Sequence, residues 1–276
     1  MNLLKRQFAP VLPEAWEEID EEASRVLKLN LAARKLVDFQ GPFGWKFAAV
    51  NTGRLEPLAS SAKAAKAATT GIAGVVTAAL REVQPLVELK APFTIPTAEL
   101  DAITRGADDP DLDAVVKAAE AIARAEDDAI FNGNAAAKIA GIIPSSPHNP
   151  IPVADPSKWP WAVAKAKEAL RGAGINGPYA LALGPKSYDE VTAASEDGYP
   201  IRKRIEQIID GPLVWAPAVS GAVLLSVRGG DYELTVGHDL GIGYTYHHRD
   251  SVELYISETF TFRILEEAAA IALKRG

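Results

Sequence analysis

Cysteine is absent from the 276-residue chain, which excludes a disulfide framework, a thiolate metal site and a cysteine nucleophile. Apolar residues are never continuous over the roughly 18 positions that a membrane span needs, and the first residues lack the apolar run of a signal peptide. An excess of basic residues is missing as well, because 36 acidic residues outnumber 29 basic ones. We therefore expect a soluble, cytoplasmic protein whose partner is neither a membrane nor a nucleic acid.

The residues that are present make up an ordinary globular composition, with 48% apolar and 24% charged residues. A chain of this length buries roughly 73% of the surface that it exposes when unfolded. The chain can therefore build a hydrophobic core without metal ions or cross-links.

Hydrophobic periodicity predicts two long helices and a strand-rich last third. Apolar residues at helical spacing indicate helices over 14–37 and 111–132, and Gly133 is placed to end the second helix. Six prolines in 141–160 indicate an irregular crossing segment. Because no βαβ rhythm is visible, the expected fold class is α+β. The shorter expected elements are helices over 161–171, 188–194 and 201–209, and strands over 83–94, 179–183, 222–227, 232–236, 252–256 and 259–264.

No motif of catalysis is recognisable in the sequence. Patterns such as H-E-x-x-H, G-x-S-x-G, Walker A and G-x-G-x-x-G are all missing. His247 and His248 are adjacent, so in a strand they point to opposite faces and make a weak zinc site. Glu126 falls near the apolar stripe of its helix, where a buried carboxylate needs a partner. Serine and histidine are both present, so a hydrolytic triad stays open as an alternative.

Short motifs in a fixed order along nearly the whole chain carry more information than any one of them alone. They are Leu3-Leu4-Lys5-Arg6-x-Phe8-Ala9-Pro10, Trp16-x-x-Ile19-Asp20, Gly41-Pro42-Phe43-Gly44-Trp45, Pro85-Leu86-Val87-Glu88-Leu89, Phe93-Thr94, Glu126-Asp127-x-x-Ile130-Phe131-x-Gly133, Gly177-Pro178-Tyr179, Gly198-Tyr199-Pro200, Trp215-Ala216-Pro217, Arg228-Gly229-Gly230-Asp231-Tyr232-x-Leu234, Gly237-x-Asp239-x-x-Ile242-Gly243-Tyr244 and Glu258-Thr259-Phe260-Thr261-Phe262. Taken together, they resemble the encapsulins, the linocin-like shell proteins of bacterial nanocompartments.

The resemblance implies an α+β fold of the HK97 phage-capsid type, divided into three regions. These regions are a peripheral domain (1–44, 77–133 and 224–276), an extended loop (45–76) and an axial domain (134–223). The Ala-rich stretch 59–79 is longer than the matching loop of the family, and we interpret it as an insertion.

The function that the resemblance implies is self-assembly into a closed icosahedral shell, which needs no catalytic residue. Icosahedral symmetry makes the number of subunits a multiple of sixty, and a chain of this size resembles the smallest members, so we expect about sixty copies. The shell would enclose a cargo enzyme, such as a dye-decolourising peroxidase or a ferritin-like iron-oxidising protein, recruited through a short peptide at its end. Iron storage or protection from oxidative stress would be the task of that cargo.

The family docks the cargo peptide inside the shell beside the amino-terminal helix, which requires an apolar groove with a few polar anchors. Plain core packing is the alternative for each apolar member of the groove. Arg34 and Asp38 stand at i, i+4, and a pair between them is the alternative interpretation of these two residues. The matching groove positions are Leu27, Leu31, Arg34, Asp38, Phe39, Asp239, Leu240 and Ile242.

The five-fold pore of the family matches a loop with two carboxylates. Its residues are Ser195, Glu196, Asp197, Gly198 and Tyr199. Five copies of the loop would make a negative ring that favours cations such as ferrous iron. A solvated acidic turn is the alternative interpretation.

Some members bind a flavin through a tryptophan that stands just before a Leu-Arg pair. Here Ala78 and Ala79 precede Leu80-Arg81, so we expect neither a flavin nor any other cofactor.

Two alternatives from other functional classes stay open. One is a hydrolase or bacteriocin-like enzyme, because relatives have been described in those terms. The other is a prophage major capsid protein, which would enclose DNA.

Overall fold

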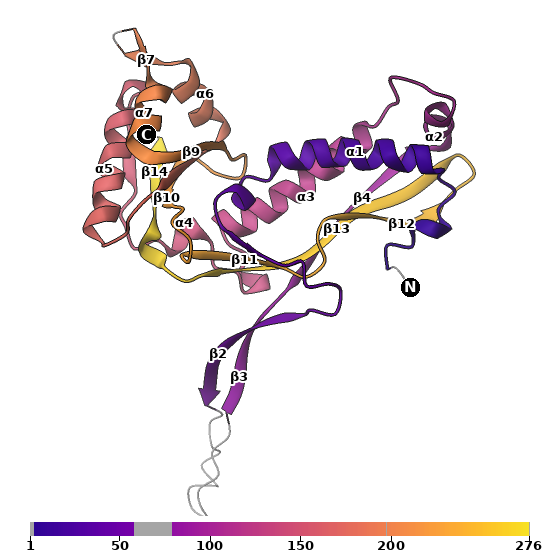
Figure 1. Ribbon diagram of the computed structural model, residues 1–276, viewed down its shortest axis with the longest axis horizontal. Helices are drawn as coiled ribbons and strands as arrows, with labels where there is room; N and C mark the ends of the chain where they lie inside the picture. Colours follow the sequence, from indigo (N-terminus) through magenta and orange to yellow (C-terminus); the bar gives the residue numbers. More distant parts are fainter. Residues whose placement is uncertain (1–2, 58–78, 197, 276) are drawn as a thin grey trace, which may run out of the picture.

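The computed structural model describes residues 3–57, 79–196 and 198–275, which form an elongated body and a projecting arm (Figure 1). Within these ranges no helix combines the length and apolarity of a membrane-crossing segment. The helices are η1 (Arg6–Phe8), α1 (Pro13–Asn30), η2 (Ala33–Lys35), α2 (Thr97–Thr104), α3 (Asp113–Phe131), η4 (Ala135–Ala137), α4 (Ile142–Ser145), η5 (Pro156–Lys158), α5 (Trp159–Gly172), α6 (Pro185–Ala193), α7 (Ile201–Ile209) and η6 (Glu267–Ala269). The strands are β1 (Asp38–Gln40), β2 (Ala49–Pro57), β3 (Ala79–Pro85), β4 (Val87–Pro96), β5 (Ile151–Val153), β6 (Tyr179–Leu183), β7 (Ser195–Glu196), β8 (Tyr199–Pro200), β9 (Asp210–Trp215), β10 (Ala222–Ser226), β11 (Tyr232–Val236), β12 (Gly241–His247), β13 (Ser251–Ile264) and β14 (Ala270–Arg275).

The first sheet is built around the long strand β13. Its order is β1-β11-β13-β12, and β4 pairs along the other edge of β13. Helices α1 and α3 lie side by side on one face of this sheet (Figure 1). Ala15, Ile19, Ala23 and Val26 recur at helical spacing on α1 and are all buried, so one face of that helix supplies the core under the sheet.

The second sheet has the order β5-β14-β10-β6-β9 and is packed against α5 and α7. Trp159 and Tyr179 are buried in its core, and the Tyr179 hydroxyl donates to the Ile175 carbonyl at 2.6 Å. The same apolar cluster continues to Phe131 at the end of α3 and to Phe262 on β13. One core therefore connects the two sheets of the body.

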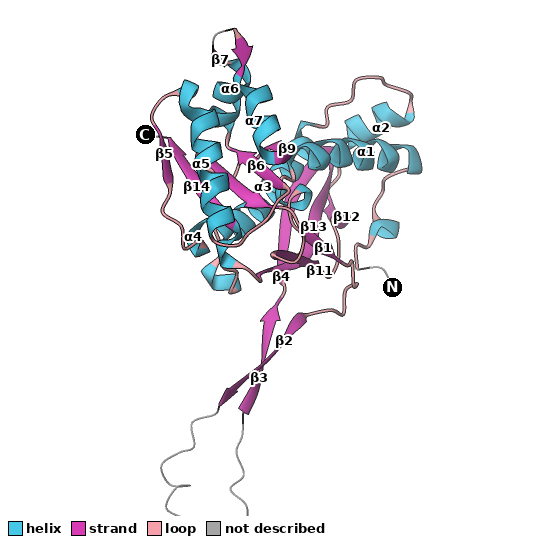
Figure 2. Ribbon diagram, turned by 60° about the vertical axis from the view of Figure 1, so that its left-hand side comes forward, coloured by secondary structure: helices cyan, strands magenta, loops and turns pink. Residues whose placement is uncertain are grey.

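Strands β2 and β3 form an antiparallel ribbon that leaves the body as an arm (Figures 1 and 2). At its root the Leu86 amide donates to the Ala48 carbonyl at 2.9 Å. Beside the root, the rings of Trp45 and His238 are stacked with 3.6 Å between their centroids. The arm is thus attached at its base, while the far part of the ribbon extends from the body.

The helix expected over 14–37 is wrong in its last seven residues, because α1 ends at Asn30. Leu31 is extended, and the chain continues through η2 into β1, which pairs in parallel with β11. The apolar spacing runs past the true end of the helix because Leu31 and Leu36 are buried in the same region by tertiary contacts.

The strand expected over 83–94 is two strands, β3 and β4, separated at Leu86. The expected strands 252–256 and 259–264 are instead one continuous strand, β13, because the polar pair Ser257 and Glu258 is buried inside it and does not end it. The crossing segment 141–160 is also more regular than expected, since it holds α4 and the edge strand β5. Helix α7 and strands β6 and β11 have the boundaries that were expected, whereas α2, β12 and β14 were not foreseen.

The division into peripheral domain, extended loop and axial domain stays a prediction. Strands β10 and β14 lie side by side in the second sheet, and the ribbon of the arm returns to the body through β3. The Ala-rich stretch 59–79 lies outside the described residues except for Ala79, the first residue of β3.

Candidate functional site

Three carboxylates surround the guanidinium of Arg34 at the junction of α1, α3 and the first sheet. Arg34 Nε lies 2.9 Å from each oxygen of Glu126, and Nη2 donates to Glu126 at 2.6 Å. Nη2 also donates to Glu258 at 2.7 Å, and Nη1 donates to Asp239 at 2.8 Å. One side chain therefore connects η2 with α3, with β13 and with the loop before β12.

The charges of this cluster interact strongly because they are buried. Glu126 and Glu258 are completely buried, and the Arg34 side chain is only 16% exposed. Burial opposes the guanidinium charge, but Glu126 and Glu258 outweigh it and raise the pKa of Arg34 above its ordinary value. Burial and the neighbouring Glu126 raise the pKa of Glu258 well above the usual range, and its Oε1 has no hydrogen-bond partner among the described residues.

Asp127 fixes the backbone that presents Arg34. Its two oxygens accept from the amides of Ala32 and Ala33, each at 2.9 Å, across 95 and 94 residues of sequence. Burial raises the pKa of Asp127 to about 7, although these two backbone hydrogen bonds act in the opposite direction. Because η2 has no capping side chain of its own, the α3 carboxylate takes that role.

Phe39 and Asp239 bring the cluster to the protein surface. The Phe39 ring is 38% exposed and lies 5.4 Å from the Arg34 guanidinium carbon, and the Asp239 side chain is 41% exposed. Each guanidinium nitrogen of Arg34 donates to a carboxylate of the same chain. A docking partner at this surface would therefore meet an aromatic ring and a carboxylate, and Arg34 would act by positioning Asp239.

The remaining apolar residues of the expected groove lie deeper. Ile242 and Leu31 are buried, whereas Leu27 and Leu240 are half-buried and pack at the margin of the core beneath α1. Core packing, the alternative for every apolar member, therefore describes Ile242 and Leu31. Leu27 and Leu240 remain partly exposed and can still contact a partner.

Asp38 is not part of the same cluster, and the alternative of an Arg34–Asp38 pair is wrong. Asp38 Oδ2 accepts instead from the Gly230 amide at 2.6 Å, beside a small polar hollow of 150 Å³ that Lys35 and Tyr232 also line. The i, i+4 spacing does not bring the two side chains together because the helix has already ended at Asn30.

Glu258, a member of the cluster, and Asp127, which holds the neighbouring backbone, were not foreseen as site residues. Glu126 was expected to need a partner, and the structure supplies Arg34 from 92 residues away. The sequence did contain a sign of the role of Glu258, because it is a charged residue inside an otherwise apolar strand pattern. If such a strand is buried, its charged residue must have a partner. Asp127 likewise is a charged residue beside Glu126 on a helix that faces the core, so it too needed a partner.

The expected pore loop lies at one end of the body, where β7 and β8 form a minimal hairpin (Figure 1). Gly198 has a positive φ of 78° in its turn, and the exposed Tyr199 hydroxyl accepts from Gln207 at 3.4 Å. Asp197 and the side chain of Glu196 lie outside the described part of the chain.

Apolar side chains on the arm are exposed to solvent. Leu55 is 63%, Leu80 53% and Val83 51% exposed, all on the ribbon of β2 and β3. A two-stranded ribbon on its own is marginally stable in water, so a neighbour that covers these side chains would stabilise it. Of the positions considered for a flavin, Ala79 starts β3 and Ala78 lies outside the described residues.

No group of three histidine or acidic residues in the described ranges is placed to hold a metal ion. Of the two adjacent histidines, His248 Nε2 lies 3.0 Å from Glu253, and His247 Nδ1 lies 2.6 Å from the Tyr244 hydroxyl. Both histidines are thus engaged with separate neighbours at an exposed hairpin.

Comparison with known proteins places these features in context. A family model described as "Encapsulating protein for peroxidase" matches residues 1–261. A Rhodospirillum rubrum protein named "Type 1 encapsulin shell protein" is 49% identical over 99% of this chain and 97% of its own length. A Mycobacterium tuberculosis protein of the same name is 42% identical over 99% of each chain.

Solved structures resemble the fold at much lower sequence identity. The virus-like particle from Pyrococcus furiosus has a TM-score of 0.64 at 14% identity and covers 94% of this chain and 99% of its own. A chain from Mycobacterium phage Bobi has a TM-score of 0.58 at 12% identity and covers 90% of both. These likenesses confirm the expected α+β fold of the HK97 capsid type.

Proposed function

Because this chain belongs to the encapsulin shell protein family, we propose that about sixty copies close into an icosahedral shell in the cytoplasm around a peroxidase or a ferritin-like cargo. Membership of the family establishes that the chain is a shell protein of capsid-like assemblies and not itself an enzyme. The hydrolase alternative is therefore wrong.

The exposed arm is the observation that best supports assembly. Leu55, Leu80 and Val83 stand on a ribbon that extends away from the body in both views (Figures 1 and 2). Several exposed apolar side chains on one projecting element, in contrast to apolar side chains scattered singly, mark an interaction site in soluble proteins. Covering each arm with a neighbouring copy removes this surface from water, and repeating that contact around a closed symmetry leaves no arm uncovered.

The direct test is the mass and shape of the purified protein expressed without cargo. Uniform hollow particles in negative-stain images, with the native mass of about sixty chains, are the expected result. Only single 29.4 kDa chains across salt and pH would contradict assembly. Particles of another discrete mass would keep the shell and reject the copy number.

The surface around Phe39 is the proposed docking place for the cargo peptide. Phe39, Leu27 and Leu240 offer apolar contacts, and Asp239 offers an acceptor held in place by Arg34. Because the accessible charged group here is a carboxylate, the surface suits an apolar peptide that brings N–H donors or a cationic side chain.

Phe39→Ser should lower cargo loading at least tenfold without changing the shell, because truncating a central aromatic contact removes much of the binding energy. Loading is measured by co-purification of a fluorescent protein that carries the terminal peptide of a candidate peroxidase cargo. The matched control is Phe43→Ser, which changes another exposed ring just after β1. Equal loading in the Phe39 variant and in the wild type would reject this docking place.

The pore and the three-region division complete the proposal. The hairpin of β7 and β8 lies at one end of the second-sheet part of the body (Figure 1), which suits a place on a five-fold axis. Five copies of Ser195–Tyr199 would then surround each axis, and their carboxylates would favour the passage of cations. The peripheral domain (1–44, 77–133 and 224–276) would hold the first sheet with α1 and α3. The axial domain (134–223) would hold β5, β6 and β9 of the second sheet, to which the peripheral range adds β14.

A further inference from the structure

Strand β12 is an edge of the first sheet. It pairs with β13 along one side, and no other strand among the described residues pairs with its outer side. An uncovered edge carries unpaired N–H and C=O groups and accepts strands from other molecules. Tyr246, near the end of β12, is 56% exposed, so an apolar surface adjoins this edge.

The amino-terminal segment 3–9 covers this edge. The Tyr244 amide, on the outer side of β12, donates to the Leu4 carbonyl at 2.8 Å. The Tyr255 hydroxyl donates to the Leu3 carbonyl at 3.4 Å, and η1 packs against β12. The Leu4 side chain approaches Gly241 so closely that a Cβ there would lie 3.2 Å from Leu4 Cδ1.

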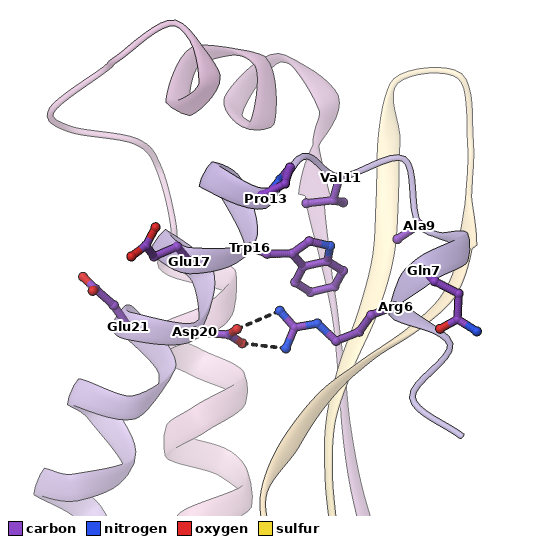
Figure 3. Close-up of a pocket in the computed structure, with 9 residues that line it drawn as sticks. All are labelled: Arg6, Gln7, Ala9, Val11, Pro13, Trp16, Glu17, Asp20 and Glu21. Carbon is purple, nitrogen blue, oxygen red and sulfur yellow. Dashed lines mark hydrogen bonds and ion pairs between the residues drawn. The ribbon is translucent and has the colours of Figure 1, made fainter. Parts of the chain in front are cut away.

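A single cation fastens the segment to α1. The two terminal nitrogens of Arg6 donate to the two oxygens of Asp20 at 3.2 and 2.7 Å, and the guanidinium carbon lies 4.0 Å from the centre of the Trp16 ring (Figure 3). Lys5 is held at a positive φ of 55°, a conformation that costs free energy for a residue with a Cβ. The contacts on either side of Lys5 must offset that cost.

None of residues 3–9 is buried. An open surface depression of 630 Å³ lies between the segment and α1, lined by Val11 and Trp16 among others (Figure 3). Since no buried side chain anchors the segment, the ion pair and the ring contact of Arg6 carry a large share of its attachment.

We propose that residues 3–9 are an edge strap, latched by Arg6, that keeps the β12 edge from pairing with a second copy of this chain. The occupant of the open edge is an extended segment of another copy, because a shell protein reaches very high local concentrations of its own strands. Aromatic and β-branched residues at 244–246 make that edge a favourable template once it is uncovered. This inference goes beyond the proposed function, since it concerns a contact that shell assembly must avoid.

The test compares Arg6→Ala with Arg25→Ala. Arg25 makes a similar two-nitrogen pair with Glu22 on the same helix, at 2.8 and 2.6 Å, but fastens no other segment. Hydrogen exchange of the peptide 241–247 should be about tenfold faster in the Arg6 variant and unchanged in the Arg25 variant. The fraction of protein in aggregates other than shells, measured by sedimentation, should rise several-fold only in the Arg6 variant.

Two results would overturn the proposal. Unchanged exchange in the Arg6 variant would show that Arg6 is no latch, and faster exchange without additional aggregates would show that the strap does not protect the edge. Asp20→Asn removes the other half of the pair and should reproduce the Arg6 effect, which guards against a folding defect peculiar to one variant. Hydrogen exchange can be compared on free subunits as well as on shells. The edge-strap proposal can therefore be tested even if the chain does not assemble.

Discussion

At the scale of single residues, Arg34 shows how a binding surface depends on groups that the partner does not touch. Its guanidinium neutralises part of a cluster in which Glu126 and Glu258 are fully buried. Removing the partner of a buried charge is costly, about 3–5 kcal/mol, because the remaining charge is left uncompensated. Arg34 therefore contributes strongly to the stability of the fold, and a loss of cargo in an Arg34 variant would not identify it as a contact.

Asp127 gives this region a pH dependence of defined sign. Its pKa is about 7 in the folded chain against an ordinary value of 3.8. Between these values the folded state holds the proton more tightly than the unfolded state, so this group adds stability as pH falls from about 7 towards 4. The gain is about 1.4 kcal/mol per pH unit, and it is lost as pH rises through 7.

Asp127→Asn should therefore flatten the rise in unfolding free energy between pH 7 and pH 5. Chemical denaturation at fixed protein concentration, repeated at several pH values, measures this slope. Asp128→Asn is the matched control, because Asp128 is the next residue of α3, is exposed, and its carboxylate accepts a hydrogen bond from the Asn132 side chain. Identical slopes for the wild type and the Asp127 variant would contradict the assignment.

At the scale of secondary-structure elements, the end of α3 decides how the two sheets are connected. Gly133 ends the helix at a positive φ of 88°, and a Cβ there would lie 2.8 Å from the Gly141 nitrogen and 3.2 Å from the Ile139 oxygen. The backbone of 139–141 therefore packs directly against this turn. Only a residue without a Cβ permits that approach.

Gly133→Ala should cost about 3 kcal/mol or more, because a left-handed alanine is strained by about 1–2 kcal/mol and the backbone contacts add steric repulsion. Gly106→Ala is the matched control: Gly106 follows α2 with a φ of 86°, and a Cβ at that position would meet no heavy atom within 4 Å. The control should cost only the strain. Equal losses of unfolding free energy in denaturant titrations would show that the close approach is unimportant.

Local pattern was sufficient for elements that pack on one face and end at a glycine or proline. Helix α3 and strand β11 are examples, since the turn after Gly133 and the Gly229-Gly230 turn both need the positive φ that glycine allows. Pattern failed where a distant residue decided the outcome. Asp127 accepts a hydrogen bond from the backbone that follows α1, and Arg34 pairs with the buried Glu258 of β13. Neither contact can be inferred from the local sequence.

At the scale of the whole molecule, the exposed arm shows that a single subunit leaves apolar side chains uncovered. The body has two hydrophobic core clusters, whereas the arm keeps Leu55, Leu80 and Val83 in solvent. An interface repeated in every copy multiplies the effect of one substitution across the assembly. A residue that matters little to the folded subunit can therefore decide whether the shell forms.

Leu55→Asp should leave the subunit folded and abolish shells, because a carboxylate at a covered apolar contact would be buried without a partner in every copy. Native mass measurement and size-exclusion chromatography would then find single chains or small oligomers. Leu265→Asp introduces the same charge at a leucine of similar exposure, 54%, on the body after β13. If shells persist in the Leu55 variant, or are lost equally in both, the arm is not the contact that drives assembly.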